Sequence, residues 1–355
     1  MTTPALRRLR EFFPEAHISL LTHEKLAELW LRFPGIDEVL TFKSGESPWS
    51  LGKRLRAKSF DLALVLPNSP RSALEVWRAR IPRRVGFARP WRNWLLTQPV
   101  AVTHTDMKKR TPRQIKNLVE RVNQNGREKA EQVGSPKGSS ILLHHTEVYL
   151  RLVGALGASS ETLPPLLEIG DDELRKTEAK WLSVAPSGVW LGLSPSAAYG
   201  AAKRWPAENF AAAVREVSNR IQGCHWIAFG GVEDASLNEQ IARLAGSNVV
   251  NVAGKTTLRE LMALLKLCRV LLTNDSGPMH VAAAFGTPVV VPFGSTSPEL
   301  TGPGLPGDAR HFLLRANVPC SPCFRRTCPI DLRCMTGITV TSVVEAVLQA
   351  ASAKR

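Results

Sequence analysis

Short apolar, β-branched runs alternate with helix-length segments along most of this chain. Strands separated by helices predict parallel sheets wrapped by helices, an α/β architecture. With 355 residues, 44% of them hydrophobic, the chain is long enough for two doubly wound, Rossmann-like domains. The runs are HISLLT (17–22), DEVLTF (37–42), DLALVLPN (61–68), RRVGF (83–87), VWLGLSPS (189–196), HWIAFGG (225–231), NVVNVAG (248–254), RVLLTND (269–275) and TPVVVPFG (287–294).

Breaks in this alternation predict the domain boundaries. Residues 106–138 are polar and carry nine Lys or Arg against four acidic residues, which predicts a mobile basic excursion. A linker containing Ser and Pro near 183–188 precedes the second series of strands. We expect an N-terminal domain over 1–182, a C-terminal domain over 183–339 and a closing helix within 340–355.

The first residues lack a strand. TTPALRRLREFF (2–13) is typical of a helix with an apolar face of Leu6, Leu9 and Phe13. Doubly wound domains begin with a strand in the middle of the sheet, and its neighbours would otherwise have unpaired edges. We therefore expect the N-terminal domain to lack its first strand and the natural protein to start upstream of Met1.

The net charge of +15 indicates an acidic partner, either nucleic acid, an anionic membrane surface or a phosphorylated substrate. The basic segment 106–138 has no recognition-helix or stacking-aromatic signature, so we expect no nucleic-acid partner. No run approaches the roughly 20 apolar residues of a membrane span, and the N-terminus is not a signal peptide. A cytoplasmic location is expected.

Four of the six cysteines lie close together in the sequence, at Cys320, Cys323, Cys328 and Cys334. A CxxC followed by two further thiols allows a structural zinc site, but the later spacings differ from those of a zinc ribbon. Reduced thiols that brace a loop are the favoured alternative. We expect no required metal or other cofactor.

A polar turn follows the apolar run that ends at Thr273. Pro278 suits the first helical position, so Gly277 is the expected N-cap, and the first backbone N–H groups of the helix would face an anion. Ser276 and His280 can donate to phosphate oxygens, whereas Asp275 suits sugar hydroxyls or bracing of the turn. The turn predicts half of a nucleotide diphosphate site; the alternative is an ordinary capped helix with a surface histidine.

Two more loops end strands at the same expected edge. Ser194, Ser196 and Lys203 follow the first strand of the second series, and Lys203 could act as a point charge on a diphosphate or be a solvated lysine. Gly230 and Gly231 allow close backbone approach, and either Glu233 or Asp234 could bind ribose hydroxyls. Three loops converging on one edge favour the nucleotide site. Further along the chain, Thr257 and Glu260 predict a capping box.

Five segments together resemble the bacterial ADP-heptose:lipopolysaccharide heptosyltransferases of glycosyltransferase family 9, most closely heptosyltransferase II. This resemblance implies a GT-B fold, with two Rossmann-like domains facing across a cleft. It also implies inverting transfer of heptose from ADP-L-glycero-D-manno-heptose to the lipopolysaccharide inner core at the cytoplasmic face of the inner membrane. The segments are NDSGPMHVAAAFGTPVVVPFGSTSPELTGP (274–303), AAKRWPAENF (201–210), NVAGKTTLRELMALL (251–265), FDLALVLPNSPRSAL (60–74) and VPCSPCFRRTCP (318–329).

The resemblance also implies roles for single residues. It places Lys203, Asp275, Ser276, Gly277 and His280 around the donor, with Lys203 and His280 stabilising the departing ADP. A lipid A–Kdo–heptose type acceptor would face the segment 66–74, on the side of Asn68, Ser69 and Ser72, and the protein would contact the membrane surface peripherally.

In the family, the proposed general base is an Asp in a glycine-rich loop. That loop comes just before the segment that matches TTPALRRLR (2–10). From this we expect the polypeptide as written to bind ADP-sugar poorly or to transfer slowly. The alternative is a catalytically impaired protein that binds a nucleotide sugar or lipopolysaccharide.

Overall fold

The computed structural model describes residues 1–102, 109–125, 143–185, 187–246 and 248–353. The chain divides into two compact units, Met1–Thr105 with Ile141–Glu168 and Asp106–Ser140 with Ile169–Arg355. Both units are built from parallel strands and helices, as the alternation predicts. None of the described helices combines the length and the apolar character that crossing a bilayer requires.

The second unit contains a six-stranded parallel sheet with the order β11-β10-β9-β6-β7-β8. Its strands are β6 (Val189–Ser194), β7 (Cys224–Ala228), β8 (Val249–Asn251), β9 (Leu271–Thr273), β10 (Val289–Phe293) and β11 (Phe312–Arg315). Its helices are α4 (Pro112–Asn125), α7 (Asp171–Trp181), α8 (Ala207–Arg220), α9 (Ala235–Ala245), α10 (Leu258–Leu267), α11 (Gly277–Ala284), α12 (Pro298–Thr301), α13 (Arg333–Thr336) and α14 (Val340–Ser352), with 3₁₀ turns η4 (Ala201–Lys203) and η5 (Val232–Asp234).

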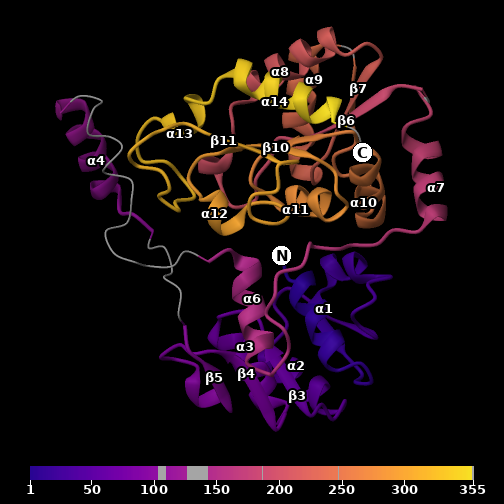
Figure 1. Ribbon diagram of the computed structural model, residues 1–355, viewed down its shortest axis with the longest axis vertical. Helices are drawn as coiled ribbons and strands as arrows, with labels where there is room; N and C mark the ends of the chain where they lie inside the picture. The colour runs from indigo at the N-terminus through magenta and orange to yellow at the C-terminus, as the bar shows by residue number, and fades with distance from the viewer. Residues whose placement is uncertain (103–108, 126–142, 186, 247, 354–355) are drawn as a thin grey trace. The chain divides into compact units, whose positions relative to one another are not determined.

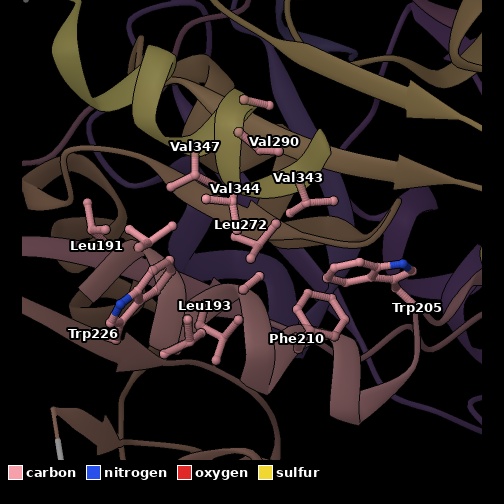
Figure 2. Packing of buried hydrophobic residues seen from close by; sticks show 14 of the residues in the cluster. Leu191, Leu193, Trp205, Phe210, Trp226, Leu272, Val290, Val343, Val344 and Val347 are labelled. Atoms are coloured by element: carbon pink, nitrogen blue, oxygen red, sulfur yellow. The ribbon is translucent and has the colours of Figure 1, made fainter. Parts of the chain in front are cut away.

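Alternating strand residues supply the two hydrophobic faces of this sheet. Leu191, Leu272 and Val290 point toward α8, α9 and α14, whereas Trp190 and Leu271 point toward α7, α10 and α11. Figure 2 shows the first of these clusters, in which valines of α14 lie over the strand residues. Helices therefore cover both faces (Figure 1), and the strand ends are left for ligand binding.

The first unit contains two separate parallel ladders, β1-β2 and β3-β4-β5. Its elements are α1 (Thr3–Phe12), β1 (Ser19–His23), η1 (Glu24–Trp30), β2 (Glu38–Phe42), α2 (Pro48–Arg56), β3 (Leu62–Val65), α3 (Pro70–Arg78), β4 (Arg83–Phe87), η2 (Asn93–Leu95), β5 (Gln98–Val100) and α6 (His145–Gly154). Residues of β1 and β3 share hydrophobic clusters, although the ladders described for this unit do not join them. The absence of a first strand stays a prediction.

All nine apolar runs form strands in the structure, and the helices expected at 2–13 and within 340–355 are present. The sequence did not indicate β5 and β11. Both are short edge strands, and β5 contains Pro99, which is unfavourable in a central strand. Pairing with a neighbouring strand, rather than local pattern, determines these two elements.

Within the expected basic excursion, residues 112–125 form helix α4, which the composition did not indicate. Ile115 and Val119 pack with Cys320 and Cys323, and the Arg110 backbone N–H donates to the carbonyl of Cys323 at 3.0 Å. The apolar side of the helix thus outweighs its basic composition. Residues 106–108 and 126–138 of the excursion lie outside the described residues.

Helix α7 packs with the second unit, although a boundary at 182/183 would place it in the first. Glu173 accepts from Arg259 of α10 at 2.7 Å, and Lys180 donates to Glu260 of the same helix at 2.6 Å. The closing helix α14 likewise packs on α8 and belongs to the second unit.

Candidate active site

Four loops meet at the carboxyl edge of the second sheet. Because β10, β9, β6 and β7 are adjacent and parallel, the segments that follow them lie side by side. These segments are 294–297, 274–276, 195–203 and 229–233. Of the residues that the sequence places in the donor site, the strand β6 ends with Ser194 and helix α11 carries Gly277 and His280. The segments themselves contain Ser196, Lys203, Gly231, Glu233, Asp275 and Ser276.

The centre of this edge is a buried ion pair. The Lys203 ammonium lies 2.6 Å from Oδ2 of Asp275, and their side chains are 12% and 5% exposed. Thr296 donates its hydroxyl to the same Oδ2 at 2.6 Å. Desolvation of both charges offsets much of their attraction, so the pair is weak evidence for stability.

Asn274 holds the loops around this pair. Its side-chain amide donates to the carbonyl of Pro195 at 2.6 Å, and its Oδ1 accepts from the backbone N–H of Trp205 at 3.0 Å. The residue is fully buried. It therefore fixes the end of β9 against the loop that carries Lys203. The sequence analysis predicted neither this role of Asn274 nor the contact of Thr296 with Asp275.

The helix after β9 begins one residue earlier than expected. Ser276, not Gly277, is the N-cap of α11, with Gly277 and Pro278 as its first two residues. The Ser276 hydroxyl lies 3.2 Å from that of Thr273 and does not cap the helix. Gly277 is exposed with open space around its Cα, and His280 is half-buried in the first turn. The positive end of the helix dipole is thus directed to the loop edge.

The cysteine-rich segment forms a wall of the site. Tyr199 donates its hydroxyl to the carbonyl of Phe324 at 2.8 Å, and the Tyr199 ring lies 4.7 Å from Lys203 Nζ and 5.3 Å from the Arg326 guanidinium. A Cβ at Gly200 would be 2.4 Å from the carbonyl oxygen of Arg326, so a side chain there would clash. Neither Tyr199 nor Arg326 stands out in a local sequence pattern.

The four clustered cysteines are free thiols. Cys320, Cys323 and Cys334 are buried, and Cys328 is half-buried. Burial raises the pKa of Cys320 and raises that of Cys334 to about 12, and the neighbouring thiols add to both shifts. Within the part of the chain that the structure describes, no three or more His, Cys, Asp or Glu side chains are arranged to hold a metal.

The other donor-side residues are at the same edge but further apart. Ser194 ends β6 and is buried, and Ser196 is half-buried in the following loop. Gly231 donates its N–H to Asp234 at 2.9 Å, and Glu233 is exposed. Since β7 is two strands from β9, the ends of these two strands lie about 10 Å apart.

The residues expected on the acceptor side belong to the first unit. Ser69 is the N-cap of α3, and its hydroxyl accepts from the Ser72 N–H at 3.1 Å. Asn68, Ser69 and Pro70 are exposed at this helix end.

Two units that each contain parallel strands and helices, with a Lys–Asp pair beside a helix N-terminus at the edge of the second sheet, are the features expected of a glycosyltransferase of the GT-B type. The model of glycosyltransferase family 9 (heptosyltransferase) matches residues 48–333, and the chain belongs to this family. The expected family and fold class are thereby confirmed.

Known proteins similar to this chain support the assignment. Lipopolysaccharide heptosyltransferase 2 of Salmonella typhimurium is 29% identical over 313 residues, which cover 85% of this chain and 81% of that protein. The solved structure of E. coli ADP-heptose lps heptosyltransferase II has a TM-score of 0.73 at 25% identity, covering 99% of this chain and 94% of that one. A family 9 glycosyltransferase from Veillonella parvula has a TM-score of 0.76 at 21% identity, with 99% and 92% covered.

Proposed function

We propose that this protein transfers heptose from ADP-heptose to the inner core of lipopolysaccharide, as a heptosyltransferase II. The observation that carries the proposal is the buried pair of Lys203 and Asp275 next to the first turn of α11. Membership of family 9 and similarity to a structure named for ADP-heptose support the choice of donor.

The proposed catalytic contribution is stabilisation of the departing ADP. Breaking the bond between sugar and diphosphate leaves an additional negative charge on the phosphate, so donors aimed at that oxygen lower the barrier. An ammonium has three N–H donors. Lys203 donates to Oδ2 of Asp275 at 2.6 Å and to the backbone carbonyl of Asp275 at 3.5 Å, which leaves one N–H for a phosphate oxygen. Ser276, His280 and the backbone of the first turn at Gly277 would supply further donors.

Asp275 has a second role in this proposal. Lys203 and Thr296 both bond to its Oδ2, so among the described contacts its Oδ1 is the oxygen that can accept a sugar hydroxyl. Ser194, Ser196, Gly231 and Glu233 would line the remainder of the donor site. We place the acceptor, a lipid A–Kdo–heptose type core, near Asn68, Ser69 and Ser72.

We further infer that transfer requires no metal ion. The carboxylate nearest to the proposed diphosphate is Asp275, and its Oδ2 is already neutralised by Lys203. A Mg²⁺ ion usually binds through one or two carboxylates together with the phosphates. Transfer should therefore persist in EDTA, and its abolition would contradict this inference.

The substrate also determines the proposed location. An acceptor anchored by lipid A requires the enzyme to work at the cytoplasmic face of the inner membrane. The net charge of +15 favours peripheral contact with an anionic surface, and no nucleic-acid partner is proposed.

The function is tested by titrating ADP-heptose calorimetrically and by assaying transfer to heptose-deficient lipopolysaccharide core. Lys203→Ala should lower the rate of transfer about 100-fold or more, because it removes a charge from the leaving-group site. Lys203→Arg keeps the positive charge and should lower the rate of transfer less than Lys203→Ala does. Lys176→Ala is the matched control, since Lys176 is an exposed lysine on helix α7.

Binding of ADP-heptose without any transfer by the unsubstituted chain would favour a binding protein over an enzyme. No binding of ADP-heptose, with binding of another nucleotide sugar, would overturn the proposed donor.

A further inference from the structure

Four of the nine tryptophans are exposed, and all four belong to the first unit. The exposed fractions are 55% for Trp49, 38% for Trp77, 64% for Trp91 and 68% for Trp94. An indole is a large apolar group that folding normally removes from water. Four exposed indoles within 46 residues of sequence are unusual, and clustered apolar patches of this kind mark interaction sites.

Arginines and tryptophans form one surface here, which we call the Trp–Arg surface (Trp49, Trp77, Arg78, Arg80, Arg84, Trp91 and Trp94). The rings of Trp77 and Trp94 are 6.1 Å apart, and the Arg78 guanidinium lies 5.4 Å from the ring of Trp49. Arg84 donates from Nε to the carbonyl of Leu95 at 2.8 Å, which fixes the turn that carries Trp91 and Trp94. These contacts join the ends of α2 and α3 to the turn around η2.

This surface contains a hollow of about 440 Å³, lined by Trp49, Trp77, Arg78, Arg80 and Arg84. The side chains of Arg78, Arg80 and Arg84 supply guanidinium groups to this lining. Hydrogen bonds from a guanidinium to an anionic oxygen are charge-assisted and therefore strong. Three guanidinium groups between two indoles suit a phosphate that is attached to an apolar body.

The segment that contains the hollow has a net positive charge. Residues 43–100 contain twelve Lys or Arg and three acidic residues, a net charge of +9 out of +15 for the whole chain. Two of the acids, Glu46 and Glu75, already form ion pairs with Arg54 and Arg71. A positive surface with exposed indoles complements the anionic head groups of a bilayer.

We propose that the Trp–Arg surface docks the protein on an anionic phospholipid bilayer, with the indoles at the interface and one lipid phosphate in the hollow. This proposal rests on the proposed function, because the acceptor in that function is a lipid. Trp77 and Trp94 meet edge to face at 69°, so they do not present parallel faces on which successive bases of RNA could stack.

One helix connects this surface to the proposed acceptor side. Ser69 caps the start of α3, while Trp77 and Arg78 lie at its end. Nine helical residues span about 13 Å. Docking through the end of α3 would therefore hold Ser69 within a short distance of the lipid head groups.

The test is sedimentation of the full chain with vesicles of phosphatidylethanolamine and phosphatidylglycerol, compared with vesicles of phosphatidylcholine. The unsubstituted chain should bind the anionic vesicles preferentially. Trp91→Ser with Trp94→Ser, and separately Arg80→Glu, should each weaken binding about fivefold or more. The matched control is Leu244→Ser with Arg243→Glu, which alters an exposed leucine and an exposed arginine on α9.

Equal binding to both vesicle types, or equal loss in the variants and the control, would overturn the proposal. So would binding of an RNA oligonucleotide in place of vesicles. Titration of ADP-heptose into each variant separates this result from the proposed function: a variant that keeps donor binding and loses vesicle binding supports the docking surface. A chain that binds vesicles through this surface but not ADP-heptose would contradict the donor assignment alone.

Discussion

At the scale of single residues, polar groups that bond to one another hold the loops of the donor side. Asn274 bridges two loops, and Asp275 accepts from both Lys203 and Thr296. Such networks are rigid when every member is satisfied. The donor groups proposed for the diphosphate are therefore held in place before a ligand arrives, which is what stabilisation of a developing charge requires.

His280→Ala should lower the rate of transfer about tenfold or more and leave the fold intact. The side chain lies in the first turn of α11, where it can donate to the leaving diphosphate, and it is only half-buried. Steady-state transfer kinetics and a thermal unfolding curve measure the two effects. His17→Ala, at an exposed histidine of the first unit, is the control. An unchanged rate would identify the turn as an ordinary helix start.

At the scale of elements, the start of a helix can depend on both the local sequence and tertiary contacts. The capping box expected at the start of α10 is confirmed: Thr257 accepts from the Glu260 N–H at 3.1 Å, and Glu260 accepts from the Thr257 N–H at 2.8 Å. Glu260 also pairs with Lys180 of α7. A local cap thus also holds a second helix against the sheet.

Thr257→Ala should lower the free energy of unfolding by about 1 kcal/mol, since the first turn of α10 loses its side-chain acceptor. Thr257→Ser keeps the hydroxyl and should be close to neutral. Urea denaturation followed by circular dichroism measures both. Equal stability of the Ala variant and the unsubstituted protein would mean that the cap contributes nothing to α10 in this fold.

At the scale of the whole molecule, one buried histidine makes stability depend on pH. His311 is 1% exposed in its side chain. Burial lowers its pKa to about 4, although the carboxylate of Asp308, 3.6 Å away, acts in the opposite direction, and Arg310 lowers it further. The folded protein therefore keeps this imidazole neutral at a pH where an unfolded chain would protonate it.

Stability should fall by about 3 kcal/mol as the pH is lowered from 6.5 to 4. A folded pKa below the unfolded value means that the contribution is fully present above pH 6.5 and is lost below it. His311→Asn removes the titrating group and should flatten this part of the profile. Urea midpoints of both proteins, measured between pH 6.5 and 4, test this expectation. If stability of the His311→Asn variant depends on pH as steeply as that of the unsubstituted protein, the expectation is contradicted.

Much of the candidate site could be predicted from the sequence, because strand ends are visible in local patterns. Lys203, Asp275 and Ser276 each follow an apolar run, and the structure brings Lys203 and Asp275 together. Tyr199 and Arg326 could not be found in this way. Their importance comes from contacts between segments more than 100 residues apart, for which no local spacing exists.

The amino-acid sequence by itself determined the strands, most of the helices and the polar turns at the strand ends, since side-chain periods and capping residues act over a few positions. Tertiary structure decided which residues of other segments those turns contact. The order β10-β9-β6-β7 places β9 beside β6, and only this pairing brings Lys203 to Asp275 and Asn274 to Trp205. It also decided that α4 docks on the cysteine-rich segment and that four indoles stay exposed, because burial depends on which surfaces the folded chain leaves uncovered.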